Sequence, residues 1–445
     1  MSLALALVLA ASIDGEAALR HASALAALGP HPWGSPRNNA AAEYVAAELR
    51  QAGLVAVQLS GFEAQGTRGT NVIATLGGPS EELVVVCAHH DTAPDSPGAY
   101  DDGGGVGILI EIARVVAAQP LRARTFVFAS FDGEEAWATG KGTTAGSRAW
   151  IERLGPAARR IVGVLAIEMS GWPGGTPVVH PIAYADPRRR GGTVVAPAWL
   201  VRAALDGARD AGSPLAVGDP WLSWVYQPAV RAFRVGLYGD DLSFLQAGIP
   251  ALMVSDSSFS AFYPHYHQPT DTADRLDAAS LARTGAAVLG AARALDRAPG
   301  RGGDEPAWFA GLGRVTGSWT LLVLGAASVL PGLRAGFAVG GPGLGARLVQ
   351  VVLFFVLLWR HTVPALFVLL LPNALLPMRR GRWGTILALA PLAAVVALGA
   401  SAWWRGMVDG TWLAPWELAV LLGALVLAFL RPPGGKSARR KRSRR

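Results

Sequence analysis

The sequence predicts an α/β fold: a sandwich with helices on both faces of a central, mostly parallel mixed sheet, followed by an all-α domain of several transmembrane helices. Short apolar, β-rich runs alternate with longer helix-like segments between residues 35 and 300, and this alternation is typical of a sheet covered by helices. Residues 316–431 are almost purely apolar, in a chain that is 51% hydrophobic and only 16% charged. That second region predicts the membrane domain.

The predicted elements of the α/β region follow one another in regular order. We expect helices at residues 38–52, 106–118, 198–211 and 278–295. We expect strands at residues 71–76, 83–87, 125–131, 162–167 and 251–254. In sheets of this kind, sites form at the carboxyl ends of the strands, so polar residues directly after these runs are the candidates for chemistry.

Composition divides the chain into five segments. The apolar run at its start is too short for a membrane span, and it is either signal-like or the remnant of a helix. A Pro/Gly-rich charged stretch separates the α/β domain from the apolar region. The predicted segments are an N-terminal apolar segment (1–25), the α/β domain (26–297), a linker (298–315), a transmembrane domain of about five helices (316–431) and a basic tail (432–445).

Positive charges predict how the apolar region lies in a bilayer. The expected spans are near 316–333, 337–359, 362–377, 384–404 and 413–431. Arg360 and His361 separate the second and third of these, which would otherwise form one long helix and leave four spans. Five spans place the basic loops and the tail together on the cytoplasmic side. We therefore expect an integral membrane protein, in the inner or plasma membrane if the source is bacterial, with residues 1–315 extracytoplasmic.

The net charge of +8 is concentrated at one end of the chain. The last ten residues carry seven positive charges and no acid. A basic run after an apolar segment indicates contact with the anionic lipid bilayer, and it argues against nucleic acid as a partner. The single cysteine, Cys87, excludes an intrachain disulfide and lies in an apolar run typical of a core. The sequence makes no prediction of oligomeric state.

Two motifs lie between the predicted strand at 83–87 and the predicted helix at 106–118. The segment VVVCAHHDT places Asp91 two residues after His89. At strand spacing both side chains point the same way, so Asp91 can orient a metal-binding imidazole. Asp101 and Asp102 lie in a glycine-rich turn that enters a helix. We assign Asp101 to metal binding, as a carboxylate able to bridge two ions, and Asp102 to a supporting role such as helix capping.

Three further segments supply acids and histidines. Glu134 and Glu135 follow a buried strand, where one can bind metal while its neighbour acts as a general base. Glu168 ends another apolar strand, and YPHYHQPTDT supplies His265, His267 and Asp271. Two histidines and three carboxylates at strand ends match a pair of divalent ions that share one carboxylate, an arrangement found in peptidases, phosphatases and nucleases.

At this point the chain resembles the zinc peptidases of family M28. The family pattern reads H-x-D, G-A-x-D-[DN]-x-x-G, F-x-x-E-E, a carboxylate after a strand and a late H-x-x-x-D-T, and all occur here in order between residues 35 and 295. GDDLSFLQAGIPAL and the early GSPRNNAAAEYV also resemble family segments. The resemblance implies the fold of a zinc-peptidase/phosphorylase-hydrolase-like domain and a peptide substrate.

The resemblance also implies a role for each residue at two zinc ions. His89, Asp101 and Glu168 would hold the first ion. Asp101, Glu135 and His267 would hold the second, with Asp101 as the bridge. Glu134 would be the general base and Asp91 would orient His89.

One position departs from the common pattern of the family. Glu168 stands where most members have Asp, and membrane members of the endoplasmic reticulum and vacuole also have Glu there. The resemblance therefore points to that membrane branch. The leading expectation is an aminopeptidase; the alternatives are a glutaminyl-cyclase-like or carboxypeptidase activity, and a non-catalytic scaffold or receptor domain. Candidate pocket aromatics, which are equally well explained as core residues, are Trp221, Trp224, Tyr226, Tyr238 and Tyr263.

Overall fold

The computed structural model describes residues 12–119, 122–135, 143–182, 184–185, 188, 193–218, 239–256, 263–303, 307–311 and 314–317. The predicted membrane domain, beyond its first two positions, and the basic tail lie outside these residues. In the described part of the chain, no helix combines the length and the hydropathy that a membrane crossing needs.

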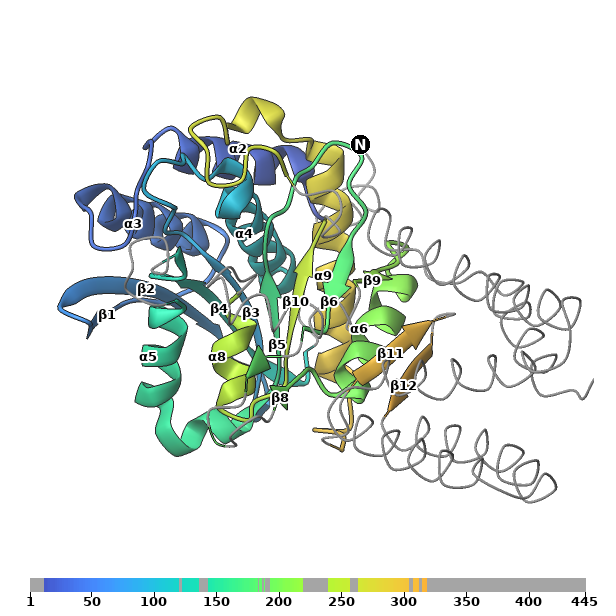
Figure 1. Cartoon of the computed structure of the whole chain (residues 1–445). Coiled ribbons are helices and arrows are strands. Elements are labelled where there is room, and N and C mark those ends of the chain that lie inside the picture. Colours follow the sequence, from blue (N-terminus) through green and yellow to red (C-terminus); the bar gives the residue numbers. More distant parts are fainter. Residues whose placement is uncertain are drawn as a thin grey trace, which may run out of the picture. The chain divides into compact units, whose positions relative to one another are not determined.

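An eight-stranded sheet forms the centre of the described structure, in the order β1-β2-β4-β3-β5-β10-β6-β9 (Figure 1). The four strands in its middle, β4, β3, β5 and β10, are parallel to their neighbours in this group. The pairs β1–β2, β2–β4 and β6–β10 are antiparallel. The strands are β1 (Ala56–Ala64), β2 (Thr67–Leu76), β3 (Ser80–His89), β4 (Arg124–Phe131), β5 (Ile161–Ile167), β6 (Val178–His180), β9 (Ala216–Val217) and β10 (Ala251–Ser255). The predicted α/β fold with a mixed sheet is confirmed.

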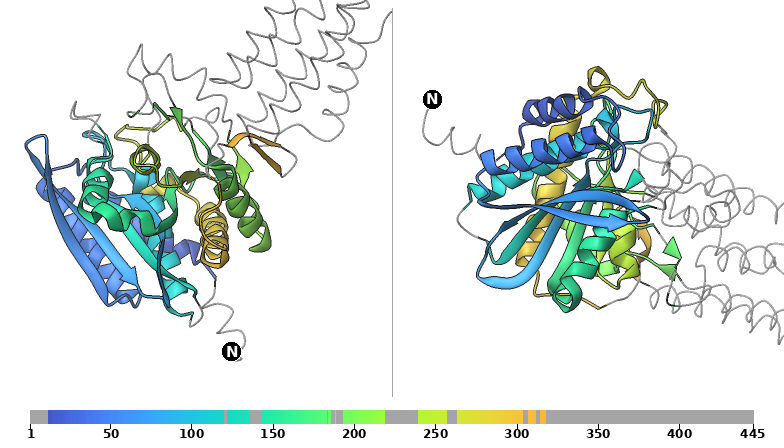
Figure 2. Two further views of the ribbon diagram at one scale, coloured as in Figure 1. Left: turned by 90° about the horizontal axis from the view of Figure 1, so that it is seen from below. Right: turned by 90° about the vertical axis from the view of Figure 1, so that its left-hand side faces the viewer.

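Helices cover both faces of this sheet (Figure 2). Alternate residues of β3 show the two sides: Val84 and Val86 belong to one core, and Val85 and Cys87 belong to the other. This is the period of two that a strand imposes on its side chains. The first core includes α2 (Gly15–Ala26), α3 (Pro36–Gln51), α4 (Gly104–Ala117), α6 (Ala198–Asp210) and α9 (Ala278–Arg297), and the second includes α5 (Ala145–Leu154) and α8 (Asp241–Gln246).

Local sequence signals explain where these helices begin and how closely they pack. Ser35 caps α3 by accepting a hydrogen bond from the Asn38 N–H, and Pro36 occupies the first turn. Asp277 caps α9 in the same way through the Ser280 N–H. Gly107 lets α4 approach α2, because a Cβ there would lie 2.3 Å from the Ala18 carbonyl oxygen. Steric fit therefore requires glycine at this crossing.

Short elements complete the described structure. They are the π-helical turn η1 (Ala99–Gly103), the 3₁₀ turns η3 (Gly155–Arg160) and η4 (Ala273–Arg275), and the strand pairs β7 (Tyr184–Ala185) with β8 (Thr193–Val194) and β11 (Ala307–Gly311) with β12 (Arg314–Gly317). The last pair occupies the predicted linker and the first two positions of the predicted membrane domain.

Candidate metal centre

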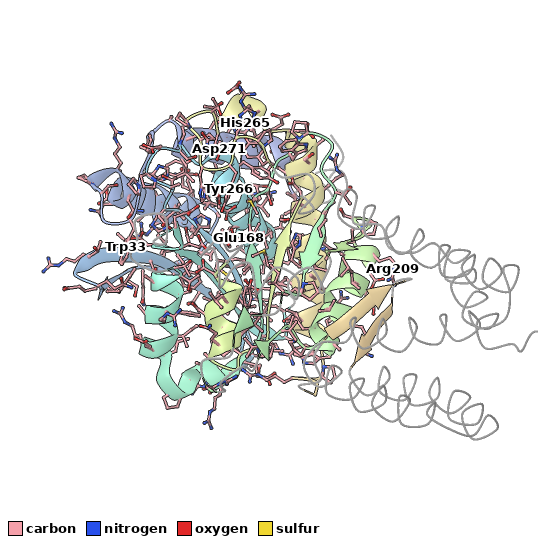
Figure 3. The ribbon with its side chains drawn as sticks, in the orientation of Figure 1. Trp33, Glu168, Arg209, His265, Tyr266 and Asp271 are labelled. Carbon is pink, nitrogen blue, oxygen red and sulfur yellow. The ribbon has the colours of Figure 1, made fainter. Side chains whose placement is uncertain are left out.

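Acids and histidines gather at the carboxyl ends of three adjacent parallel strands, β4, β3 and β5. His89 is the last residue of β3, Glu134 and Glu135 follow β4, and Glu168 directly follows β5. The loop that carries His265, Tyr266 and Asp271 lies above Glu168 in Figure 3. The site therefore lies where a parallel sheet is expected to place one.

Asp101, in η1, lies between two histidines from distant segments. Its Oδ1 is 3.2 Å from His89 Nε2, and its Oδ2 is 3.2 Å from His267 Nε2. Each carboxylate oxygen thus faces a different imidazole. A carboxylate in this position can bridge two cations that are each also bound by one histidine.

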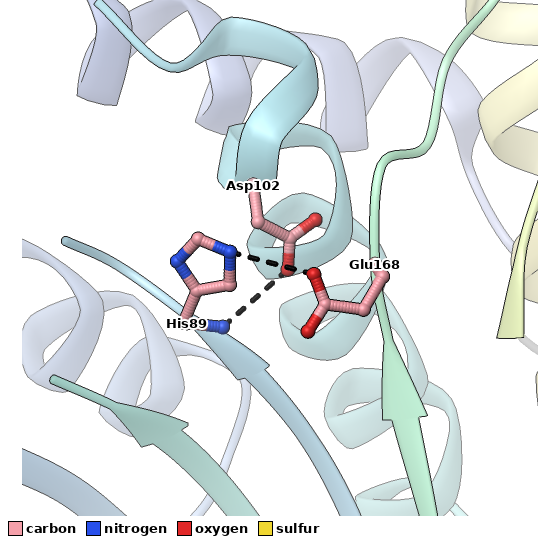
Figure 4. Close-up of side chains that lie close together, drawn as sticks. All are labelled: His89, Asp102 and Glu168. Carbon is pink, nitrogen blue, oxygen red and sulfur yellow. Dashed lines mark hydrogen bonds and ion pairs between the residues drawn. The ribbon is translucent and has the colours of Figure 1, made fainter. Parts of the chain in front are cut away.

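Glu168 and Asp102 complete the group around His89 (Figure 4). Glu168 Oε2 is 3.5 Å from His89 Nε2. His89, Asp102 and Glu168 each offer a ligand atom within 4.8 Å of the others. The Asp102 carboxylate, however, accepts hydrogen bonds from the backbone N–H of His89 and of Gly105 in the first turn of α4. Asp102 therefore joins the end of β3 to the start of α4, as a supporting residue would.

The second group consists of Asp101, Glu135 and His267, whose ligand atoms also lie within 4.8 Å of one another. Glu135 Oε1 is 2.6 Å from His267 Nε2. The His267 backbone has a φ of +56°, a conformation that non-glycine residues rarely adopt. Its ring stacks on Tyr266, with 3.6 Å between the ring centroids. These contacts direct the imidazole toward Asp101 and Glu135.

Asp91 holds the Glu134–Glu135 segment. Its Oδ1 accepts a hydrogen bond from the Glu134 N–H and its Oδ2 accepts one from the Glu135 N–H, both at 3.0 Å. His89 Nδ1 lies 2.9 Å from the Asp91 carbonyl oxygen and 3.6 Å from its carboxylate. His89 Nδ1 thus lies nearer to the main chain of Asp91 than to its carboxylate, and the carboxylate accepts hydrogen bonds from the backbone of the two glutamates.

The cluster is buried and rich in negative charge. His89, Asp101, Glu134, Glu135 and Glu168 are each at most 4% exposed. Within the described part of the chain, Glu134 Oε1, Glu135 Oε2 and Glu168 Oε1 are buried without a hydrogen-bond partner. Buried carboxylate oxygens are costly unless a cation or a proton compensates them.

The pKa values in the cluster show how strongly it attracts positive charge. Burial, and after it the charge of the neighbouring Asp101, raise the pKa of Glu135 to about 8. Burial and the charge of Glu168 raise the pKa of Glu134. Burial lowers the pKa of His267, but its hydrogen bonds with Asp101 and Glu135 outweigh that effect and bring it to about 10. Without a metal, the site would therefore collect protons, whereas divalent cations would supply the same charge.

The donor set fits zinc. Imidazole nitrogen and carboxylate oxygen are its ordinary protein ligands at catalytic sites. The orphaned oxygens of Glu135 and Glu168 lie one in each group, so each group has an unused ligand atom.

The structure brings all seven sequence-predicted site residues into this cluster, and Asp102 with them. His265 lies outside it: its Nδ1 contacts Thr270 Oγ1, and the residue is half-buried. The candidate aromatics Trp221, Trp224, Tyr226 and Tyr238 lie outside the described residues. Tyr263 is a core residue whose ring packs against Tyr100 at a tilt of 33°.

Sequence reasoning missed two roles. It did not find the contact between the Asp91 carboxylate and the backbone of the glutamate pair, and it gave Asp271 no function. Asp271 is fully buried and accepts hydrogen bonds from the N–H groups of Tyr100 and Asp101. The only signal for it was its fixed spacing after His267.

Together, the α/β fold and this cluster define a metal-dependent enzyme. Residues 71–292, which contain every member of the cluster, match the model of peptidase family M28. The chain belongs to this family and is a metallopeptidase.

The chain is also similar in sequence to curated proteins, and similar in fold to a solved structure. The chain is 28% identical over 229 residues to the uncharacterized protein YfbL of Escherichia coli, covering 48% of this chain and 67% of YfbL. It is 26% identical over 238 residues to mouse endoplasmic reticulum metallopeptidase 1, covering 52% of this chain but only 23% of the mouse protein. The fold is similar to that of the LapA aminopeptidase of Legionella pneumophila, with a TM-score of 0.53, 16% identity, and coverage of 67% of this chain and 75% of LapA.

Proposed function

We propose that this chain is a two-zinc aminopeptidase that hydrolyses the N-terminal peptide bond of its substrates. The observation that carries this proposal is the position of Asp101, whose two oxygens each face a different histidine at 3.2 Å. His89, Asp101 and Glu168 would hold one zinc ion, and Asp101, Glu135 and His267 would hold the other. When bound, zinc polarises a carbonyl group and lowers the pKa of water.

Glu134 is suited to carry the proton in this reaction. It lies next to Glu135, yet its Oε1 has no hydrogen-bond partner among the described residues. The hydrogen bond of its N–H with Asp91 holds its backbone beside the cluster. Glu134 would accept a proton from the attacking water and then donate it to the nitrogen of the leaving amine.

The different roles proposed for the two neighbouring glutamates, metal ligand for Glu135 and general base for Glu134, follow from their contacts. Glu135 Oε1 is occupied by His267 Nε2 at 2.6 Å, which commits this side chain to the second metal group. Among the described residues, no histidine forms a hydrogen bond with the Glu134 side chain. Asp91 accepts hydrogen bonds from the N–H groups of both residues, so it orients the turn that presents the base and the ligand.

We also propose that the chain is anchored in a membrane. The support comes from the apolar region 316–431 and from the basic tail. Five spans would place the metallopeptidase domain on the extracytoplasmic side, and the tail would face anionic lipid in the cytoplasm. Protease accessibility of the two ends in intact and permeabilised cells tests this topology.

The test of the catalytic proposal is hydrolysis by the purified full-length protein. A panel of aminoacyl anilides and N-terminally blocked peptides would be offered before and after chelation, and again after zinc is restored. We expect zinc-dependent cleavage of the substrates with a free amino group only. Cleavage of blocked peptides, or cyclisation of an N-terminal glutamine, would point to a different amide chemistry. A protein that binds no zinc would contradict the enzyme proposal altogether.

A further inference from the structure

Three loops around the metal centre are each held by one buried aspartate. The carboxylate of Asp91 binds the N–H groups of Glu134 and Glu135. Asp256 binds those of Gly171 and Trp172, in the loop after Glu168. Asp271 binds those of Tyr100 and Asp101. Of these three, only Asp271 holds the backbone of the residue that lies between the two histidines.

We propose that Asp271 is a positioning residue. It fixes Asp101 relative to His267, and so keeps the ligand group around His89 and the ligand group around His267 at the right distance from each other. This inference rests on the proposed two-zinc function and deepens it. Asp271 would not itself bind zinc, since it acts through the main chain of the bridging ligand.

The first step in the argument is the use of both carboxylate oxygens. Oδ1 accepts a hydrogen bond from the Tyr100 N–H at 2.8 Å, and Oδ2 accepts one from the Asp101 N–H at 3.3 Å. A carboxylate that accepts with each oxygen defines the orientation of the backbone at two successive residues. The plane of the Asp101 peptide, and with it the direction of the Asp101 side chain, is therefore set by Asp271.

The second step is that Asp271 is itself immobilised. The Tyr263 hydroxyl donates to its Oδ1 at 3.1 Å, and the Ser96 hydroxyl donates to its Oδ2 at 3.5 Å. The side chain is buried, and the Tyr263 ring packs on Tyr100 with 4.3 Å between the ring centroids. In addition, the Ala99 N–H donates to the Asp271 carbonyl oxygen. Side chain and main chain of Asp271 thus hold the same turn.

The third step is the link to His267. Asp271 belongs to the same loop, which is closed by hydrogen bonds from the Gln268 N–H to the His265 carbonyl and from the Asp271 N–H to the Gln268 carbonyl. These bonds surround His267, whose left-handed φ needs such support. Asp271 therefore connects the loop that carries His267 to the backbone of Asp101, the proposed bridging ligand.

A matched control exists at the other end of the same sheet. Asp296, in α9, is also buried and also accepts hydrogen bonds from two consecutive N–H groups, those of Ala123 and Arg124 at the start of β4. The metal centre lies beyond the opposite end of that strand. Asp296→Asn therefore removes the same kind of interaction without touching the centre.

The experiment compares zinc binding by full-length wild type, Asp271→Asn and Asp296→Asn. Zinc per chain is measured by elemental analysis, and affinity by competition with a chromophoric chelator. In Asp271→Asn an amide group faces one of the two N–H donors, so we expect the more weakly held zinc to bind about 10- to 100-fold more weakly. Asp296→Asn should lose thermal stability but keep two zinc ions at wild-type affinity. Equal zinc affinities for the two variants would overturn the proposal.

A milder pair of variants decides the matter if Asp271→Asn does not fold. Tyr263→Phe removes one hydroxyl from Asp271, and Tyr44→Phe removes a hydroxyl that contacts His21 Nδ1, outside the cluster. We expect weaker zinc binding in Tyr263→Phe only, and identical affinities would overturn the proposal. Wild type that binds two zinc ions but cleaves no peptide would contradict the aminopeptidase function while leaving this comparison valid. Wild type without zinc would overturn both before any variant is compared.

Discussion

His267 Nε2 lies 2.6 Å from Glu135 Oε1, although 132 residues separate the two in the chain. The same nitrogen is 3.2 Å from Asp101 Oδ2. Three loops from distant parts of the sequence therefore meet at one imidazole. Buried aspartates hold two of these loops: Asp91 binds the Glu135 N–H and Asp271 binds the Asp101 N–H. The two carboxylates that meet there carry more negative charge than one imidazole balances. Four predictions follow from this combination.

Removal of metal is expected to destabilise the protein. The buried oxygens of Glu134, Glu135 and Glu168 would lose the cations that compensate them. A ligand present at 100 times its Kd stabilises a fold by about 2.7 kcal/mol. We therefore expect the Tm to fall on chelation and to return when zinc is added, as measured by differential scanning calorimetry. An unchanged Tm in excess chelator would argue against a metal at this site.

Glu134→Gln is expected to abolish most of the activity and to leave the metal in place. The amide keeps the shape of the side chain but cannot accept the proton, and loss of a general base costs about 10²- to 10⁴-fold. The measurement is kcat together with zinc per chain. Glu135→Gln is the matched comparison, because Glu135 contacts His267 and its loss should weaken zinc binding. Retention of more than a tenth of the wild-type kcat by Glu134→Gln would refute its role.

Asp91→Asn separates two functions of Asp91. The carbonyl contact with His89 belongs to the main chain and survives the substitution. The contacts with the Glu134 and Glu135 N–H groups need two acceptor oxygens, and asparagine has only one. We expect kcat to fall roughly 10- to 100-fold with KM little changed, since the supporting contacts of a metal site have effects of this size. A variant with wild-type kcat would show that the carboxylate has no part in positioning the glutamates.

Asp256 predicts a pH dependence of stability. Burial raises its pKa to about 7 against hydrogen bonds from Gly171, Trp172 and Tyr100 that lower it. The folded protein therefore holds this proton more tightly than the unfolded chain. The proton on Asp256 therefore adds to the free energy of unfolding, by an amount on the order of a few kcal/mol. This stabilisation is fully present below about pH 4 and is lost as the pH rises through 7.

Asp256→Asn tests that dependence. One oxygen of Asp256 accepts from both Gly171 and Trp172, so the asparagine oxygen can replace it, and the amide nitrogen can donate to the Tyr100 hydroxyl. At pH 5 we expect the free energy of unfolding of the variant to be equal to or lower than that of wild type. At pH 8 we expect the difference to shift in favour of the variant, because only wild type loses stability as the pH rises. Urea denaturation at the two pH values measures the difference. The same stability difference at both would contradict the assignment.

The sequence predicted the central strands because each is a short apolar run buried on both faces. It missed β1, whose sequence AVQLSGFEA mixes polar and apolar residues. β1 lies at the edge of the sheet, and Leu59 within it is 46% exposed. Its sequence therefore lacks the apolar pattern that burial produces in the central strands. It also missed α8, which has only six residues and too few turns to show a helical period.

The candidate ligands could be predicted because strand ends concentrate chemistry and because the family motifs occur in order. The supporting contacts could not. Asp91 reaches Glu134 across 43 residues, and Asp271 reaches Tyr100 across 171. No local sequence pattern distinguishes an aspartate that accepts hydrogen bonds from distant N–H groups from one that accepts them from its own turn. Such contacts are defined only by the tertiary fold.

The distance between Asp101 and Asp271 along the chain also bears on how the protein is made. During synthesis, His89, Asp101, Glu135 and Glu168 leave the ribosome long before Asp271, which lies 170 residues after Asp101. Domains generally fold as units, and a structural metal site rarely exists before its domain has folded. A nascent chain without the His267–Asp271 loop would thus lack both a ligand and the residue that orients the bridge. We therefore expect hydrolytic activity to begin only once the domain is nearly complete.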